Sequence, residues 1–194
     1  MKRILLVYSL MVSGIAVADE EAAFDPDKIE RLSVQGVTAF RHAGTVTHVD
    51  LLPDGKRLLT AARDGTARIW DLETGDELKR FYHPEGADIW AAHALPGGKK
   101  LVTAGAGEMV TLWNIDKAVT NRTFEHGTTV FRVAHLEQTN RLIASDASNL
   151  CIEWDLSDGG QIRKFAGHSD DVYTVLLSAG GDFLFTGSKD GSFR

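Results

Sequence analysis

Side chains able to carry acid–base chemistry recur at regular spacing along the chain. In the first instance His42 is followed by Thr60, Asp64 and Trp70. A histidine, an aspartate and a hydroxyl can form a catalytic triad, in which the imidazole takes the proton of the hydroxyl. The same residues can instead be structural, because a buried imidazole and a buried indole N–H each need a hydrogen-bond partner.

Three further copies retain part of this set. Their members are His83, Thr103 and Trp113, then His126 and Trp154, then His168, Thr186 and Asp190. Gly107 stands where the second copy would have its aspartate, and Ala144 and Ser148 replace the threonine and the aspartate of the third. A scaffold needs the set in every unit, whereas an active site needs it once. We therefore predict a structural hydrogen-bonded set, no catalytic residues and no enzyme activity.

The segments around each set have the pattern of four short strands joined by tight turns. In the first copy the strands are expected at residues 46–52, 57–61, 66–71 and 77–81. Asp64-Gly65 supplies the hairpin turn between the second and the third strand. The unit repeats about every 42 residues. Four antiparallel strands in a period of this length predict one blade of a β-propeller.

The third strand of each copy ends in a related phrase, RIWDL, TLWNI or IEWDL. From its histidine to this Trp-Asp, the unit resembles the WD40 repeat family, over roughly residues 30–194. The resemblance implies an all-β fold: an incomplete WD40 β-propeller with about three full four-stranded antiparallel blades, part of a fourth and an N-terminal outer strand. The repeats are expected at about residues 42–82, 83–125, 126–167 and 168–194, the last one truncated. The resemblance also implies that the histidine, threonine, aspartate and tryptophan of a blade are hydrogen-bonded to one another.

An aromatic residue follows the first apolar residue of the first strand in three of the four copies. The residues at this position are Thr47, Trp90, Phe131 and Tyr173. In the family this region lies near the face where partners often bind, and Arg63 and Lys189 belong to the rim of that face. Aromatic side chains on a rigid sheet end make good binding hot spots. In the alternative interpretation the rings pack between neighbouring blades as core. In the first interpretation a candidate partner-binding face is formed by Thr47, Arg63, Trp90, Phe131, Tyr173 and Lys189.

The composition, 43% hydrophobic and 25% charged, is that of an ordinary globular protein. The net charge of −6 and the lack of a basic cluster argue against nucleic acid as a partner. Cys151 is the single cysteine, so an internal disulfide is impossible and a buried thiol is expected. His48, His93 and His135 fall at different positions of the repeat and show no ligand spacing. We therefore expect no metal and no cofactor.

The N-terminus has the organisation of a secretory signal peptide. Lys2 and Arg3 precede the apolar run ILLVYSLM, and Ala16-Val17-Ala18 offers a small-residue cleavage site. The apolar stretch is shorter than the roughly 20 residues of a membrane-spanning helix, so we expect cleavage rather than an anchor. We predict residues 1–18 as signal peptide, 19–30 as linker and 31–194 as a partial propeller. We therefore expect an exported, bacterial-type member of the family. It would be periplasmic or extracellular and would have no stable membrane insertion after cleavage.

The two ends of the repeat region favour a fragment of a longer propeller. The final SKDGSFR matches AARDGTAR of the first copy and stops before the tryptophan. Residues 31–41 match the outer strand that precedes each histidine and need three further strands from another blade. We expect the open sheet edges of such a fragment to cause self-association.

The leading functional hypothesis is a non-catalytic, exported scaffold that binds other proteins. The alternative is the propeller part of a larger exported enzyme or redox protein whose catalytic module lies elsewhere. DLETG at residues 71–75 resembles the Asp…Thr-Gly of quinoprotein repeats, but those place a tryptophan after the glycine, and here Trp70 precedes the aspartate. Propellers host many activities, so the fold alone does not decide between the two.

Overall fold

A computed structural model describes residues 41–136, 139–178 and 180–194. The predicted signal peptide, the linker and residues 31–40 of the expected outer strand lie outside the described residues. Within these ranges the chain is all-β, apart from one short 3-10 helix at Pro84–Gly86. None of the helical structure in the described ranges has the length and apolar character to cross a bilayer.

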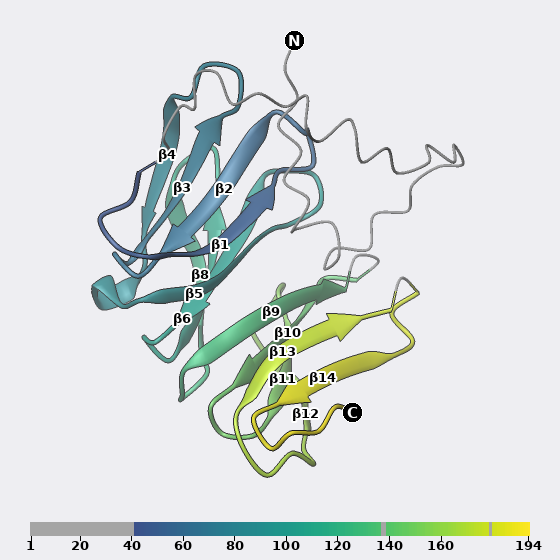
Figure 1. The fold of residues 1–194 in the computed structure, drawn as a ribbon. Helices are drawn as coiled ribbons and strands as arrows, with labels where there is room; N and C mark the ends of the chain where they lie inside the picture. The colour runs from purple at the N-terminus through teal and green to yellow at the C-terminus, as the bar shows by residue number, and fades with distance from the viewer. Residues whose placement is uncertain (1–40, 137–138, 179) are drawn as a thin grey trace, which may run out of the picture.

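The strands form successive antiparallel sheets in chain order (Figure 1). The first sheet holds β1 (Val46–Leu51), β2 (Arg57–Ala62), β3 (Thr66–Asp71) and β4 (Glu77–Tyr82). The second holds β5 (Ile89–Ala94), β6 (Lys100–Gly105), β7 (Met109–Asn114) and β8 (Val119–Glu125). The third holds β9 (Val130–Leu136), β10 (Arg141–Asp146), β11 (Cys151–Asp155) and β12 (Gln161–Phe165). The last pairs β13 (Val172–Leu177) with β14 (Leu184–Ser188).

Each four-stranded sheet is one blade, and the blades stack side by side. The first strands of consecutive blades contact one another, β1 with β5, β5 with β9 and β9 with β13, and we call these four the inner strands (Figure 1). The described residues thus hold three four-stranded blades and two strands of a fourth. The predicted all-β propeller fold is confirmed.

Tight turns join the strands of a blade, and the turn between β2 and β3 requires glycine at one position. Between β2 and β3, Gly65 has a φ of +74°, which favours glycine. A Cβ at this position would lie 2.6 Å from the carbonyl oxygen of Gly86, so the close approach of the next loop also requires glycine. The hairpin predicted at Asp64-Gly65 therefore needs glycine at position 65 for two reasons, the positive φ and the close approach of Gly86.

The hydrophobic core lies between blades rather than within one sheet. Central strands such as β2 and β6 are buried along almost their whole length. For β6 the reason is that its blade lies between two others. Phe81, at the end of β4, meets Trp113 of the next blade at 5.6 Å between ring centroids. Phe124, at the end of β8, meets Trp154 of the third blade at 5.8 Å. Each of these tryptophans thus fastens its blade to the outer strand of the preceding one.

Candidate functional site

In the first blade the four predicted residues form one hydrogen-bonded chain. The Trp70 indole N–H donates to the Thr60 hydroxyl at 2.8 Å, and this hydroxyl lies 2.7 Å from His42 Nε2. On the other side of the ring, His42 Nδ1 lies 3.1 Å from Asp64 Oδ2. When Thr60 donates to Nε2, Nδ1 carries the proton and donates to the carboxylate. This hydrogen-bonded set links β2, β3 and the loop before β1, and each of the polar side-chain atoms named here has a partner.

The Asp64 carboxylate also holds the turn in which it lies. It accepts from the backbone N–H of Ala43 at 2.9 Å, and from the backbone N–H and hydroxyl of Thr66 at 3.0 and 2.7 Å. Burial acts to raise the pKa of Asp64, but these hydrogen bonds and the one from His42 outweigh it and hold the pKa far below its usual range. Sequence reasoning missed Thr66 as a member of the set.

The fourth blade repeats this arrangement around His168. Its Nε2 lies 2.9 Å from the Thr186 hydroxyl and its Nδ1 lies 2.9 Å from Asp190. The Ser192 hydroxyl donates to Asp190 at 2.7 Å, as Thr66 does to Asp64. The missed hydroxyl therefore has a sequence signal, the phrases DGT and DGS, in which it follows the turn aspartate by two residues.

In the second blade the carboxylate is absent. The Trp113 indole donates to the Thr103 hydroxyl at 2.9 Å, and this hydroxyl lies 2.9 Å from His83 Nδ1. A Cβ at Gly107 would lie 3.6 Å from His83 Nε2, so the glycine occupies the place of the aspartate. His83 Nε2 is buried and has no partner in the described part of the chain. Burial lowers the pKa of His83 to about 4, which makes the imidazole neutral at pH 7.

The third blade has a carboxylate that the repeat alignment did not assign. The alignment places Ser148 at the aspartate position, but Asp146 lies 2.9 Å from His126 Nε2. The same carboxylate accepts from the backbone N–H groups of Ser148 and Leu150 and from the Ser148 hydroxyl. Burial acts to raise the pKa of Asp146, but these hydrogen bonds lower it below its ordinary value. Asp146 thus performs for His126 what Asp64 does for His42.

The tryptophan of the third blade lacks the hydroxyl that the others use. Ala144 stands at the threonine position, as the sequence indicates. The indole N–H of Trp154 and Nδ1 of His126 are buried without a partner among the residues that the structure describes. The two rings still pack together, with 5.9 Å between their centroids. Trp154 therefore contributes packing without a hydrogen bond.

The geometry of these sets supports the structural interpretation over the catalytic one. Thr60 is 4% exposed, and the side chains of His42 and Asp64 are 1% and 9% exposed. A catalytic nucleophile has to meet its substrate, whereas this hydroxyl sits between an indole and an imidazole. The sets hold loops and strands in place.

The aromatic position predicted for partner binding coincides with a β-bulge in every inner strand. Pairing between β1 and β2 shifts register between Val46 and His48, and the other three inner strands shift at the equivalent place. The bulged residues are Thr47, Trp90, Phe131 and Tyr173. A bulge leaves its residue unpaired and re-aims the side chain, which separates this position from the normal alternation of the strand.

Three rings and a guanidinium form a continuous row across the blades, which we call the aromatic row: Arg63, Trp90, Phe131 and Tyr173. The Arg63 guanidinium lies 5.2 Å from the Trp90 ring centroid and is ion-paired with Asp88 at 2.7 Å. Trp90 and Phe131 meet edge to face at 6.5 Å, and Phe131 and Tyr173 at 4.8 Å. Trp90 and Phe131 are half-buried, and Tyr173 is 46% exposed. The rings thus pack across blade boundaries and still reach the surface.

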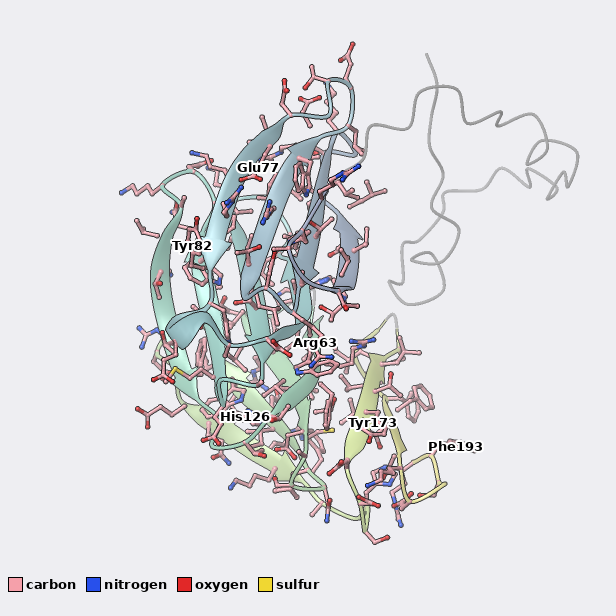
Figure 2. All side chains as sticks on the ribbon, turned by 60° about the vertical axis from the view of Figure 1, so that its left-hand side comes forward. Arg63, Glu77, Tyr82, His126, Tyr173 and Phe193 are labelled. Atoms are coloured by element: carbon pink, nitrogen blue, oxygen red, sulfur yellow. The ribbon has the colours of Figure 1, made fainter. Side chains whose placement is uncertain are left out.

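The remaining residues of the candidate face differ in their roles. The Thr47 hydroxyl donates to the carbonyl oxygen of Ile89 at 2.6 Å, so it ties the first blade to the second. Lys189 is exposed and lies 3.4 Å from Asp170. Figure 2 shows Arg63 and Tyr173 among the side chains of this region.

Three histidines of the inner strands lie outside these sets. His93 Nδ1 is 3.0 Å from Asp50 Oδ2, which joins β5 to β1. Burial lowers the pKa of His48 and of His135 to about 4. Among the described residues no group of three or more His, Cys, Asp or Glu is placed to hold a metal ion.

Two further residues of β11 are buried. Burial raises the pKa of Cys151 to about 12, which keeps the thiol protonated. Glu153 is fully buried and ion-paired with Arg141 at 3.2 Å and with Arg163, which come from the two flanking strands. The carboxylate at this otherwise apolar position therefore has polar neighbours.

Fold and site together define a repeat protein of the β-propeller class. Its blades have four antiparallel strands, begin with a buried histidine set and stack through tryptophan. A family model described as "WD domain, G-beta repeat" matches residues 35–71 and 159–194. The chain therefore carries repeats of the WD40 family.

Several curated proteins share this similarity. Guanine nucleotide-binding protein subunit beta of Nicotiana tabacum is 43% identical over 25% of this chain and 13% of its own length. Target of rapamycin complex subunit LST8 of Saccharomyces cerevisiae is 28% identical over 79% of this chain and 52% of its own. Small ribosomal subunit protein RACK1 of Candida albicans is 33% identical over 77% of this chain and 48% of its own. The chain thus spans about half, or less, of the length of these relatives.

Proposed function

We propose that the chain is a non-catalytic scaffold that binds partner proteins through the aromatic row and its rim. The observation that carries the proposal is the row itself, three rings held at equivalent bulges of neighbouring strands and exposed at the Tyr173 end. The three relatives are by name components of larger assemblies, which supports a binding role.

The chemistry of the row favours a protein segment with apolar or aromatic side chains. Rings fixed on a sheet offer a large contact area and lose little conformational entropy on binding. Arg63 and Lys189 are each ion-paired with a neighbouring aspartate and remain exposed, so they can exchange these partners for acceptors of a bound segment. The apolar contact supplies affinity, and the rim supplies orientation.

A matched pair of tyrosine substitutions tests the proposal. Tyr173 is 46% exposed in the row, and Tyr82 is 65% exposed at the end of β4, an outer strand (Figure 2). Peptides are selected from a display library on the purified chain, and their affinity is measured for both variants. We expect Tyr173→Ser to weaken binding about tenfold or more and Tyr82→Ser to leave it unchanged. Equal affinities of both variants for every selected peptide contradict the proposal, provided that both melt at the wild-type temperature.

We also propose that residues 1–18 direct export and are removed. The basic start, the apolar run and the small-residue site support this proposal. Residues 1–30 fused to a phosphatase that is active only outside the cytosol should give active enzyme in a bacterial host, with cleavage before Asp19. The double variant Leu5→Arg/Leu6→Arg should abolish the activity. Full phosphatase activity in that variant, or no activity in either, contradicts export.

Exposed aromatic side chains in β14 and in the segments on either side of it support self-association of this chain. Phe183, Phe185 and Phe193 are 66%, 46% and 84% exposed, and the first two rings stack at 6.4 Å. Exposed aromatic surface, such as that of the stacked Phe183 and Phe185, favours association in water. Light scattering should show a mass that rises with concentration and falls in Phe183→Ser/Phe185→Ser, but not in Tyr82→Ser. A concentration-independent monomer contradicts this proposal.

A further inference from the structure

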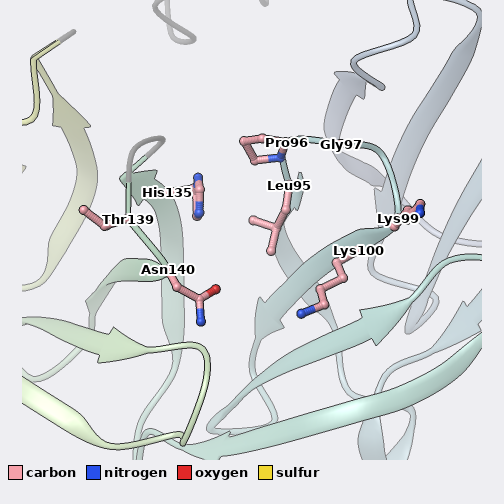
Figure 3. A pocket seen from close by; sticks show the side chains of 8 residues that line it. All are labelled: Leu95, Pro96, Gly97, Lys99, Lys100, His135, Thr139 and Asn140. Carbon is pink, nitrogen blue, oxygen red and sulfur yellow. The ribbon is translucent and has the colours of Figure 1, made fainter.

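A pocket of about 620 Å³ lies between the turns of the second and third blades (Figure 3). Its volume falls within the range of small-molecule sites in proteins. Leu95 follows the end of β5, whereas Trp90 lies near the start of that strand, so pocket and aromatic row lie at opposite ends of the inner strands. The pocket is therefore separate from the proposed partner-binding face.

The lining of the pocket is rich in hydrogen-bond donors. Lys99 and Lys100 come from the second blade, and His135 and Asn140 from the third. Figure 3 shows the Lys100 amine, the Asn140 amide and the His135 ring directed toward the same space.

One of these groups is incompletely satisfied. Nδ1 of His135 is buried and has no hydrogen-bond partner among the described residues. A buried polar atom without a partner is costly, and a ligand that supplies the partner recovers this cost. Leu95 and Pro96 form an apolar wall beside the donors. The pocket thus combines several donors with a small apolar surface.

We propose that this pocket binds a small ligand that carries an oxyanion, a phosphate ester or a carboxylate. The Lys100 ammonium supplies charge, and the Asn140 amide and the His135 imidazole supply directed hydrogen bonds. Charge-assisted hydrogen bonds to oxyanions are the strongest that side chains make.

Protonation of His135 is coupled to occupancy of the pocket. Among the residues that the structure describes, the titratable and charged groups near it are His93 from β5, which is hydrogen-bonded to Asp50 of β1, and Lys99 and Lys100 from the lining. Burial first, and His93 second, lower the pKa of His135 to about 4. An anion beside the ring favours the imidazolium form, so a bound oxyanion raises this pKa.

Titration of the 194-residue chain with sodium phosphate, at constant ionic strength with sodium chloride, tests the proposal. Nuclear magnetic resonance follows the His135 imidazole and the Asn140 side-chain amide. We expect both signals to shift in a saturable way and the pKa of His135 to rise. Lys100→Gln should weaken the apparent affinity about fivefold, the effect of one lost ion pair. Lys164→Gln, which removes an exposed lysine of β12, is the matched control and should bind as the wild type does.

A second titration with sodium acetate identifies the source of the oxyanion. Saturation by phosphate alone points to a phosphate ester, and saturation by acetate as well points to a carboxylate, and both outcomes support the site. The proposal is overturned if neither anion shifts His135, or if Lys164→Gln weakens binding as much as Lys100→Gln does. Melting curves of both variants establish that they are folded. Tyr173→Ser leaves this binding unchanged, so failure of this proposal is distinguishable from failure of the scaffold function.

Discussion

A single hydroxyl determines how well each blade satisfies its tryptophan. The indole N–H groups of Trp70 and Trp113 donate to a threonine, whereas Trp154 faces Ala144 and has no partner in the described part of the chain. All three rings are almost fully buried. The hydrogen bond to a threonine hydroxyl distinguishes Trp70 and Trp113 from Trp154.

This difference predicts unequal costs for the same substitution. Trp70→Phe removes ring volume and also leaves the Thr60 hydroxyl without its donor, whereas Trp154→Phe removes ring volume together with an unpaired N–H. We expect Trp70→Phe to be more destabilising by about 1–2 kcal/mol in urea unfolding. Trp70→Ala, a large core truncation, should cost about 3–5 kcal/mol. Equal costs for the two Phe variants disprove the argument, and an unchanged midpoint for Trp70→Ala shows that this ring is not core.

The second blade offers a gain-of-contact experiment. Gly107→Asp places a carboxylate near His83 Nε2, where the other blades have one. The new Cβ comes to 3.0 Å from the Ala87 side chain, so the variant is built together with Ala87→Gly. We expect the pKa of His83, measured by nuclear magnetic resonance, to rise from about 4 toward its ordinary value. Gly107→Ala in the same background adds the Cβ without the carboxylate and should leave the pKa low. If the pKa of His83 rises in both variants, the change is due to packing and not to the carboxylate.

The residues of the sets could be predicted wherever the turn keeps its ordinary sequence. In the first and fourth blades the phrase Asp-Gly fixes the aspartate, and the predicted side chains lie within hydrogen-bond distance. In the third blade the turn is SDASN, and Asn149, with a φ of +69°, takes the left-handed position that Gly65 holds in the first. Alignment by position selects Ser148. Only the geometry shows that Asp146, at the end of β10, reaches the histidine.

At the scale of the strand, β11 departs from its counterparts by burying a carboxylate. Glu153 is fully buried, while Arg141 and Arg163 are half-exposed and can return to water. Replacing a buried ion pair by an apolar residue is often neutral or stabilising, whereas leaving the buried charge unpaired is strongly destabilising. The sign of a substitution therefore depends on which partner is removed.

We expect Glu153→Leu to leave the free energy of unfolding unchanged or to raise it by about 1 kcal/mol. Arg141→Ala/Arg163→Ala, which keeps the carboxylate without its partners, should lower it by about 3 kcal/mol. Thermal or urea unfolding measures both. If Glu153→Leu is the more destabilising variant, the carboxylate contributes net stability and the argument is wrong.

Strand positions followed from the sequence, but the bulges did not. The expected strands at residues 46–52, 57–61, 66–71 and 77–81 agree with β1 to β4 to within one residue at each end. A bulge depends on which residue of the neighbouring strand is paired, and apolar periodicity carries no information about that register. The choice between core and surface for the aromatic row depended on the bulges. The sequence located these residues without showing how they lie.

For the whole molecule, stability depends on contacts between neighbouring blades, as in other repeat proteins. Buried histidines lie in several blades, and burial lowers the pKa of His48, His83 and His135 to about 4. Protonation of any one of them therefore acts on the junctions that hold the stack together. Acid should therefore begin to destabilise the molecule at pH values well above those at which carboxylates titrate.

His83, which is 2% exposed, makes the free energy of unfolding depend on pH. Its pKa is about 4 in the folded chain, against an ordinary value of 6.5, so the unfolded chain binds more protons between these two values. Stability therefore falls as pH falls through this window, and one such histidine accounts for about 2 kcal/mol between pH 7 and pH 5. The pKa of Asp64 is lowered, so its contribution is present above the unfolded carboxyl pKa and is lost only at lower pH. Urea unfolding at a series of pH values should show the loss, and His83→Gln, which does not titrate, should reduce it by the contribution of one histidine. A free energy of unfolding that is constant from pH 7 to pH 5, or a His83→Gln variant with the wild-type slope, contradicts a neutral buried imidazole at this position.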